Sequence, residues 1–207
     1  NVISVGRTDG GHQRNTVPVS GDSLYGSVRS APLLVAPESI TSNATPVVSA
    51  AAALLVQTGH DAGLSLSESS TSISGAGTIY NAERSETIKA ALMAGADRDT
   101  SNIGTTANIS DYRSAGHETA NGLDDRYGAG QVDILNSYHI LTGGEQPSVQ
   151  EGGGDIDRFG FDYGEAFGGL SGSPRTASYF FSTATDVTLF SSLAWNVAVS
   201  NDNALTT

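Results

Sequence analysis

The sequence is organised around one uncharged run, which reads Thr41-Ser42-Asn43-Ala44-Thr45-Pro46-Val47-Val48-Ser49-Ala50-Ala51-Ala52-Ala53-Leu54-Leu55. No charged residue lies between Glu38 and Asp61, and residues 47–56 are apolar apart from Ser49. Apolar or small side chains on every side are typical of a helix enclosed by protein. We therefore expect a central core helix here, wrapped on all sides by protein and too short to span a bilayer.

Both ends of this predicted helix carry residues that favour them. Pro46 lies near the start, where a missing N–H costs little, and Gly59 is predicted to end the helix. Ser42 would then stand at the N-terminal mouth, where free N–H groups and the helix dipole favour developing negative charge. A serine in that position can act as a nucleophile whose own N–H stabilises an oxyanion. A Thr-Ser pair before a helix can also serve as an ordinary N-cap.

The same stretch resembles the nucleophile segment of the subtilisin-like serine proteases, or subtilases. Their signature reads Gly-Thr-Ser-x-Ala-x-Pro-His-Val-Ala-Gly, and it is matched in register by Thr41, Ser42, Ala44, Pro46 and Val48. Three further segments resemble subtilase landmarks in the same chain order, namely residues 1–6, 34–37 and 127–133. The resemblance covers residues 1–141, and it implies the C-terminal half of a subtilisin-like parallel α/β domain.

Departures from the subtilase pattern bear on activity. Ile40 replaces the glycine before Thr-Ser, Val47 replaces a histidine, and Ala50 replaces a second glycine. A β-branched residue such as isoleucine does not easily adopt the positive-φ geometry that glycine permits. In addition, only residues 38–40 lie between the landmark at residues 34–37 and Thr41. A typical subtilase has a long excursion at this point, which helps to form the substrate cleft. We expect either a different cleft or a site that has decayed.

The resemblance implies that Ser42 is the catalytic nucleophile and that its partners lie outside this chain. In subtilases the aspartate, the histidine and the oxyanion asparagine all precede the strand with which this chain begins. The histidines of the chain lack the His-Gly-Thr-His setting of the family's base; they are His12, His60, His117 and His139. A serine without a base has no means of losing its proton at neutral pH. Peptide hydrolysis is therefore expected only with the N-terminal part of the protease domain, or another polypeptide, as partner.

Composition narrows the classes of partner and compartment. Lys plus Arg 10 against Asp plus Glu 22 gives a net charge of −12, which argues against nucleic acid and anionic membrane surfaces. The sequence has no cysteine, which excludes disulfides and thiolate metal sites. An acidic chain rich in Gly, Ser and Thr suits a secreted, extracellular protein. We see no signal peptide, membrane-inserting run or initiator methionine, so the first residue is expected to be a cut or a sequence boundary.

The rest of the first domain is predicted to alternate between excursions and short helices. Residues 61–82 are polar and rich in Gly, Ser and Thr, which indicates a surface excursion. Ser85, followed by Glu86, is expected to start a short helix that ends at Gly95. Residues 97–126 are predicted to form loops, and the final helix of the domain is predicted over residues 132–141.

Glycine-rich sequence separates this domain from a region in which the apolar residues recur with a different spacing. Residues 1–142 form the predicted subtilase-like portion, and residues 143–155 form a predicted linker. Residues 156–207 are predicted to contain strands, because apolar side chains fall on one parity from Val187 to Val199. They resemble the opening strands of the jelly-roll-like β-sandwich appended to many subtilases. A sandwich this incomplete must pack on the first domain, on another chain or on further sequence.

Two acidic sets are candidates for calcium, an ion that subtilases often use. The first comprises Asp155, Asp157 and Asp162, and the second comprises Asp124, Asp125 and Asp133. Acidic loops are also commonly just solvated, so no ligand is assigned.

Two classes of function follow from the sequence. In the first, the chain is the nucleophile-bearing fragment of a secreted serine endopeptidase that acts on peptide substrates. In the second, it is a non-catalytic extracellular structural or assembly protein that keeps a subtilase-like fold and associates with other polypeptides through its incomplete sheet. The retained Thr-Ser-x-Ala-x-Pro residues favour the first, and Ile40 and the short cleft segment favour the second.

Overall fold

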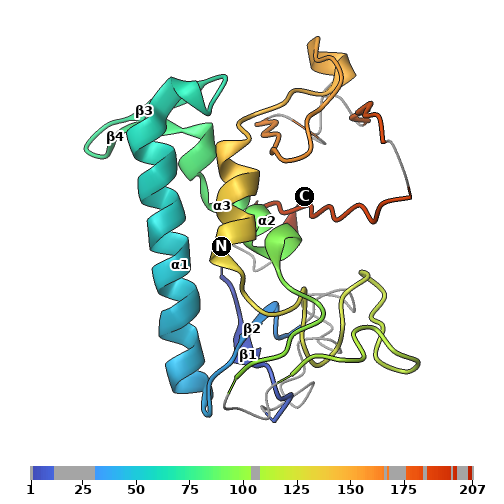
Figure 1. Cartoon of the computed structure of the whole chain (residues 1–207). Helices are drawn as coiled ribbons and strands as arrows, with labels where there is room; N and C mark the ends of the chain where they lie inside the picture. Colours follow the sequence, from blue (N-terminus) through green and yellow to red (C-terminus); the bar gives the residue numbers. More distant parts are fainter. Residues whose placement is uncertain are drawn as a thin grey trace.

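The structure is a computed structural model of the 207-residue chain. It describes residues 2–11, 31–103, 108–165, 167, 176–183, 186–196, 198–199 and 205–206. The elements in chain order are β1 (Val5–Arg7), β2 (Leu34–Ala36), α1 (Thr41–Ala62), η1 (Gly63–Ser65), β3 (Ser70–Ile73), β4 (Gly77–Tyr80), η2 (Asn81–Glu83), α2 (Ser85–Gly95), α3 (Ile134–Thr142), η3 (Val149–Glu151), β5 (Ala198–Val199) and β6 (Leu205–Thr206). Figure 1 shows the long helix α1 along one side, with β1 and β2 beside its N-terminal end and the β3–β4 hairpin at its C-terminal end.

β1 and β2 form a parallel pair, in which Gly6 lies opposite Val35. All three residues of β2 are buried, as expected of a strand in a parallel sheet. On its other side β2 meets Gln131, which forms an isolated parallel bridge with Val35. β1 overlaps the first segment that resembles a subtilase landmark, residues 1–6, and β2 lies within the second, residues 34–37. With the antiparallel pairs β3–β4 and β5–β6, they give a mixed α/β fold of helices and small sheets.

Helix α1 is longer than predicted, because it continues past Gly59 to Ala62 and ends at Gly63, whose φ is +58°. Gly59 serves packing instead. A Cβ atom at this position would lie 2.8 Å from the backbone carbon of Ala82, so the absence of a side chain allows η2 to lie directly against the helix.

The expectation that α1 is enclosed on all sides is wrong for this chain. Its buried face is a single stripe of residues three to four positions apart: Ala44, Val48, Ala51, Leu55 and Gly59. Leu54 is 57% exposed, and Val47 and Val56 are also exposed. The physical reason is that β1, β2, η2, α2 and α3 all contact α1 but cover only the face formed by this stripe, leaving an uncharged surface in solvent.

Helices α2 and α3 pack closely against each other, next to α1 (Figure 1). Both lie where the sequence predicted helices, and α2 ends at the predicted residue, Gly95. Ser137 of α3 is fully buried, and its backbone nitrogen would lie 2.7 Å from a Cβ atom placed on Gly95. Asp133 caps α3 by accepting a hydrogen bond from the backbone N–H of Asn136 at 3.0 Å.

The turn formed by residues 127–130, with Gln131 after it, connects β2 to the residues that follow α2 through backbone hydrogen bonds. Gly128 has φ +61°, and a Cβ atom on it would lie 2.4 Å from the backbone carbonyl of Leu33. The N–H of Ala129 donates to that carbonyl at 2.8 Å, and Gln131 exchanges two backbone hydrogen bonds with Asp97. This segment therefore has a structural reason for its glycines, independent of any resemblance.

The surface excursion predicted after α1 contains the β3–β4 hairpin, which the sequence did not predict. Further along, residues 144–165 fold back on the body without long elements, and Phe161 is buried with the main core. Residues 176–181 lie along residues 149–156 through a parallel bridge between Asp155 and Phe180. Side chains of the predicted strand face, such as Leu193 and Trp195, are more than half exposed. The linker over residues 143–155 and the β-sandwich over residues 156–207 remain predictions.

Among the residues described, no helix combines the length and the apolar composition that crossing a bilayer requires.

Candidate functional site

Ser42 lies in the first turn of α1, and its side chain is exposed. Ile40 precedes the helix in an extended conformation, with φ −139° and ψ 151°, and its carbonyl accepts hydrogen bonds from the N–H groups of Asn43 and Ala44 at 3.1 Å each. The extended backbone suits isoleucine. The substitution of glycine by Ile40 therefore causes no backbone strain at this step.

The N–H groups of Thr41 and Ser42 have no hydrogen-bond acceptor among the described residues. They belong to the first turn, whose donors lack intrahelical partners, and no acidic side chain occupies that turn. The N-terminal end of α1 therefore presents two free donors and the positive end of the helix dipole beside the Ser42 hydroxyl. This arrangement is suited to an anion or an oxyanion.

No histidine in the described part of the chain contacts Ser42. His60 lies eighteen residues further along α1, about 27 Å away at the rise of an α-helix, and its Nδ1 is 3.0 Å from Glu83 Oε2. His117 pairs with Asp125, and the ring of His139 stacks on Phe159 with centroids 5.6 Å apart. His12 falls outside the described residues. Ser42 is thus exposed and accessible, but no base accompanies it in the described chain.

A carboxylate and imidazole pair lies in the loop between α2 and α3, where the sequence had predicted only loop. The Nδ1 atom of His117 is 2.7 Å from Asp125 Oδ1, and both side chains are partly exposed. The geometry is that of a base and its orienting carboxylate. However, no hydroxyl group of the described residues is bonded to the other ring nitrogen. Sequence reasoning missed the pair because its members are eight residues apart in irregular chain, where spacing carries no periodic signal.

Asp124 organises this loop from inside. Its carboxylate is fully buried and accepts hydrogen bonds from the guanidinium group of Arg126, at 3.0 Å from Nη2, and from the backbone N–H of Arg113 at 2.7 Å. Burial by itself would raise the pKa of Asp124, but the hydrogen bonds from Arg126 and Arg113 outweigh it and lower the pKa. The pKa of Asp111 is also lowered, chiefly by a hydrogen bond from Arg126. The same interactions raise the pKa of Arg126 despite its burial.

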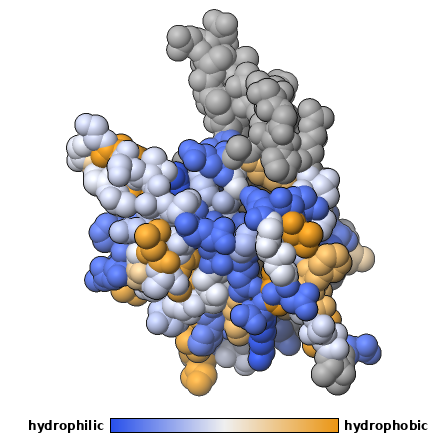
Figure 2. Space-filling view, turned by 90° about the horizontal axis from the view of Figure 1, so that it is seen from above, coloured by the Kyte–Doolittle hydropathy of each residue, from blue (hydrophilic) through white to orange (hydrophobic). Residues whose placement is uncertain are grey.

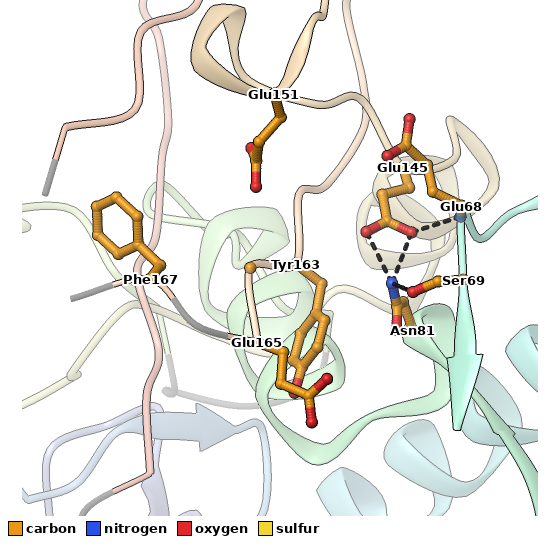
Figure 3. Close-up of a pocket in the computed structure, with 9 residues that line it drawn as sticks. Glu68, Ser69, Asn81, Glu145, Glu151, Tyr163, Glu165 and Phe167 are labelled. Carbon is orange, nitrogen blue, oxygen red and sulfur yellow. Dashed lines mark hydrogen bonds between the residues drawn. The ribbon is translucent and has the colours of Figure 1, made fainter. Parts of the chain in front are cut away.

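A pocket of about 410 Å³ lies at the opposite end of α1 from Ser42. We call it the acidic pocket, and Figure 3 shows that its lining residues come from the start of β3, from η2 and from the segment after α3, with Glu145, Asn81 and Ser69 turned toward one another. It is lined by Glu68, Ser69, Asn81, Glu145, Glu151, Tyr163, Gly164, Glu165 and Phe167. Because α1 is about 33 Å long, this pocket is not a substrate cleft for Ser42.

Glu145 is the best-anchored carboxylate of the acidic pocket. It accepts hydrogen bonds from the Asn81 side-chain amide at 2.9 and 3.1 Å and from the backbone N–H of Glu68 at 2.6 Å. Partial burial raises the pKa of Glu145, and the charges of Glu68 and Asp162 raise it further against the effect of these hydrogen bonds. Burial also raises the pKa of Asp162, to which the nearby Glu151 contributes.

The predicted calcium sets are not assembled as metal sites. Among the residues that the structure describes, no group of three or more His, Asp or Glu side chains is arranged to hold a metal ion. Two members of the second set are engaged otherwise, because Asp124 is paired with Arg126 and Asp133 caps α3.

Comparison with known proteins adds no relative to this description. No family model, curated protein or solved structure matches the chain. The resemblance to subtilases therefore stands only on the residues quoted for it.

Proposed function

We propose that this chain is the nucleophile-bearing part of a secreted subtilisin-like serine endopeptidase, active only when another polypeptide segment supplies the aspartate and the histidine. The observation that carries the proposal is the placement of Ser42. Its hydroxyl is exposed in the first turn of α1, beside two N–H groups that have no acceptor among the described residues.

The proposed chemistry uses these groups in order. The Oγ atom of Ser42 attacks the carbonyl carbon of a peptide bond and passes its proton to the imidazole of the partner. The carbonyl oxygen gains negative charge as the tetrahedral intermediate forms, and the N–H of Ser42 donates to it at the positive end of α1. The imidazolium then protonates the amine as the C–N bond breaks, and water hydrolyses the resulting ester of Ser42, which releases the acid and restores the hydroxyl. The described part of the chain places no first proton acceptor beside Ser42, so the chain alone is expected to be inactive.

The sheet offers a route by which a partner can reach Ser42. One edge of β1 pairs with β2. No strand of the described chain pairs with the other edge of β1. β1 and β2 are parallel, and α1 begins shortly after the C-terminal end of β2. A strand added in parallel to β1 would end at the same edge of the sheet, and the residues after it would approach Ser42.

Labelling with a fluorophosphonate probe tests the proposal. The chain is treated with and without an N-terminal companion polypeptide, and labelled residues are identified by mass spectrometry. We expect labelling of Ser42 only in the complex and its loss in the Ser42→Ala variant. Ser49→Ala is the matched control, because Ser49 is exposed on the same helix two turns further on. If Ser42 stays unlabelled under both conditions, the proposed peptidase function is rejected.

The second candidate is a non-catalytic extracellular assembly protein. The exposed and uncharged side of α1, with Leu54 57% exposed, favours it, because a surface helix normally turns charged residues to solvent. In this case the companion polypeptide binds, as measured by analytical ultracentrifugation, while Ser42 stays unlabelled. Binding that is unaffected by Leu54→Asp would count against this candidate.

A further inference from the structure

Residues 144–165 are fastened to the C-terminal end of α1 at the acidic pocket. The backbone N–H of Glu145 donates to the carbonyl of Leu66 at 3.1 Å, and its side chain accepts from Asn81 and from the N–H of Glu68. On the other side Gln146 donates to the carbonyl of Phe161 at 2.7 Å. Glu145 is therefore the point at which the returning segment meets the residues between η1 and η2.

The same contact concentrates negative charge. The acidic pocket is lined by four glutamates and by no basic residue. The surface seen from above in Figure 2 is mostly hydrophilic, with apolar side chains in separate small patches. Arg84 is the nearby cation, but it is engaged above the ring of Tyr163, 4.7 Å from the ring centre. The charged and titratable groups around Glu145 are Glu68, Glu151, Asp162, Tyr163 and Glu165, with Arg84 and Glu86 beside Tyr163.

Neutral donors hold these carboxylates in place. Asn81 and a backbone N–H bind Glu145, and the hydroxyl of Tyr179 donates to Asp162 at 2.6 Å. Hydrogen bonds of this kind favour the charged carboxylates, but they do not cancel the opposing effect of burial and of the neighbouring negative charges. Protons can remove the repulsion without disturbing the backbone contacts.

We propose that the acidic pocket is a pH-sensitive clasp, which holds residues 144–165 more tightly against the C-terminal end of α1 in mildly acidic medium than at neutral pH. Each proton taken up by the pocket removes one charge from a group of like charges. The contact then keeps its backbone hydrogen bond to Leu66 and loses electrostatic repulsion.

The direction of the effect follows from linkage. The pKa values of Glu145 and Asp162 are raised above 4.5 and 3.8, respectively, when the segment is docked. The docked state therefore binds protons more readily than the open state, and docking weakens as pH rises through the raised pKa values. Docking strengthens as pH falls from neutrality toward the ordinary range of these carboxyls.

Hydrogen exchange followed by mass spectrometry tests the clasp on the full chain. Protection of peptides from residues 144–165 is compared with that of the N-terminal half of α1 at about pH 7 and about pH 5, after correction for intrinsic exchange. We expect the protection of residues 144–165, divided by that of the N-terminal half of α1, to rise by about twofold or more at the lower pH. In the Glu145→Gln/Asp162→Asn variant, the ratio should be high at both pH values and should lose its pH dependence.

Two further variants keep the test decisive. Glu151→Gln removes one lining charge and leaves both titrating carboxyls, so it should raise protection at about pH 7. Asp99→Asn removes an exposed charge in the loop after α2 and should keep the full pH response. The clasp is overturned if the wild-type ratio does not change with pH, or if the Glu145→Gln/Asp162→Asn variant responds as the wild type does.

Discussion

Asp124 shows how one side chain can shape a long irregular loop. It is fully buried, and it gathers the backbone N–H groups of Arg113, Arg126 and Tyr127 as well as the Arg126 guanidinium group. A buried charge of this kind is tolerated because each of its hydrogen-bonding sites is filled. The sequence shows the acidic residues of this loop, but it does not show which of them lies inside.

Replacing Asp124 by asparagine should destabilise the chain by about 3 kcal/mol, because the partly buried guanidinium group of Arg126 would lose its buried countercharge. Urea denaturation at neutral pH measures the effect. Glu118→Gln is the matched control, since the ion pair between Glu118 and Arg113 is exposed and should contribute less than about 1 kcal/mol. Equal losses in the two variants would show that the burial of Asp124 is not the cause.

Neighbouring leucines of α1 separate the two faces of the helix. Leu55 is 1% exposed and Leu54 is 57% exposed. Leu55→Ala leaves a cavity in the core and should cost about 3 kcal/mol of unfolding free energy, whereas Leu54→Ala should change it by less than about 0.5 kcal/mol. Chemical denaturation of the isolated chain measures both. A large loss for Leu54→Ala in the isolated chain would mean that this face is covered after all.

The close approach of α2 and α3 depends on a glycine. A Cβ atom on Gly95 would lie 2.7 Å from a backbone nitrogen of α3, so Gly95→Ala must push the helices apart and should cost about 2 kcal/mol. Gly154→Ala is the control, because nothing lies within 4 Å of its added Cβ and the change should stay within about 0.5 kcal/mol. Thermal unfolding of both variants measures the difference. An unchanged Tm for Gly95→Ala contradicts the packing described.

The elements that the sequence predicted well are those whose residues carry a local signal. α1 and α2 have clear starts and periodic small or apolar residues. The end of α1 was misplaced because Gly59 is a packing glycine and Gly63 is the stop, a distinction that depends on the contact with Ala82. The β3–β4 hairpin was missed because its strands are polar and mostly exposed.

The chain as a whole should be most stable in mildly acidic solution. Its net charge of −12 opposes folding at neutral pH. As pH falls, the raised pKa values of Glu145 and Asp162 add stability. Asp111 and Asp124 act in the opposite sense. Because their pKa values are lowered, their contribution is present above about pH 4 and is lost as pH falls further.

Unfolding free energies measured with urea between about pH 3 and pH 8 should therefore pass through a maximum near pH 5. In Asp124→Asn the decline on the acid side should be shallower, because one of the carboxylates responsible for it is gone. A profile that rises steadily up to pH 8 would contradict the assigned directions of these pKa shifts.

The sequence by itself determined the uncharged helix that begins near Ser42 and the two later helices, because each is encoded by neighbouring residues. It also led to Ser42 as a candidate nucleophile, which remains a prediction. Only the tertiary structure decided which face of α1 is buried, that Asp124 lies inside the long loop, and that the carboxylates of the acidic pocket meet. Those features depend on contacts between residues that are distant in the chain, and no local pattern specifies them.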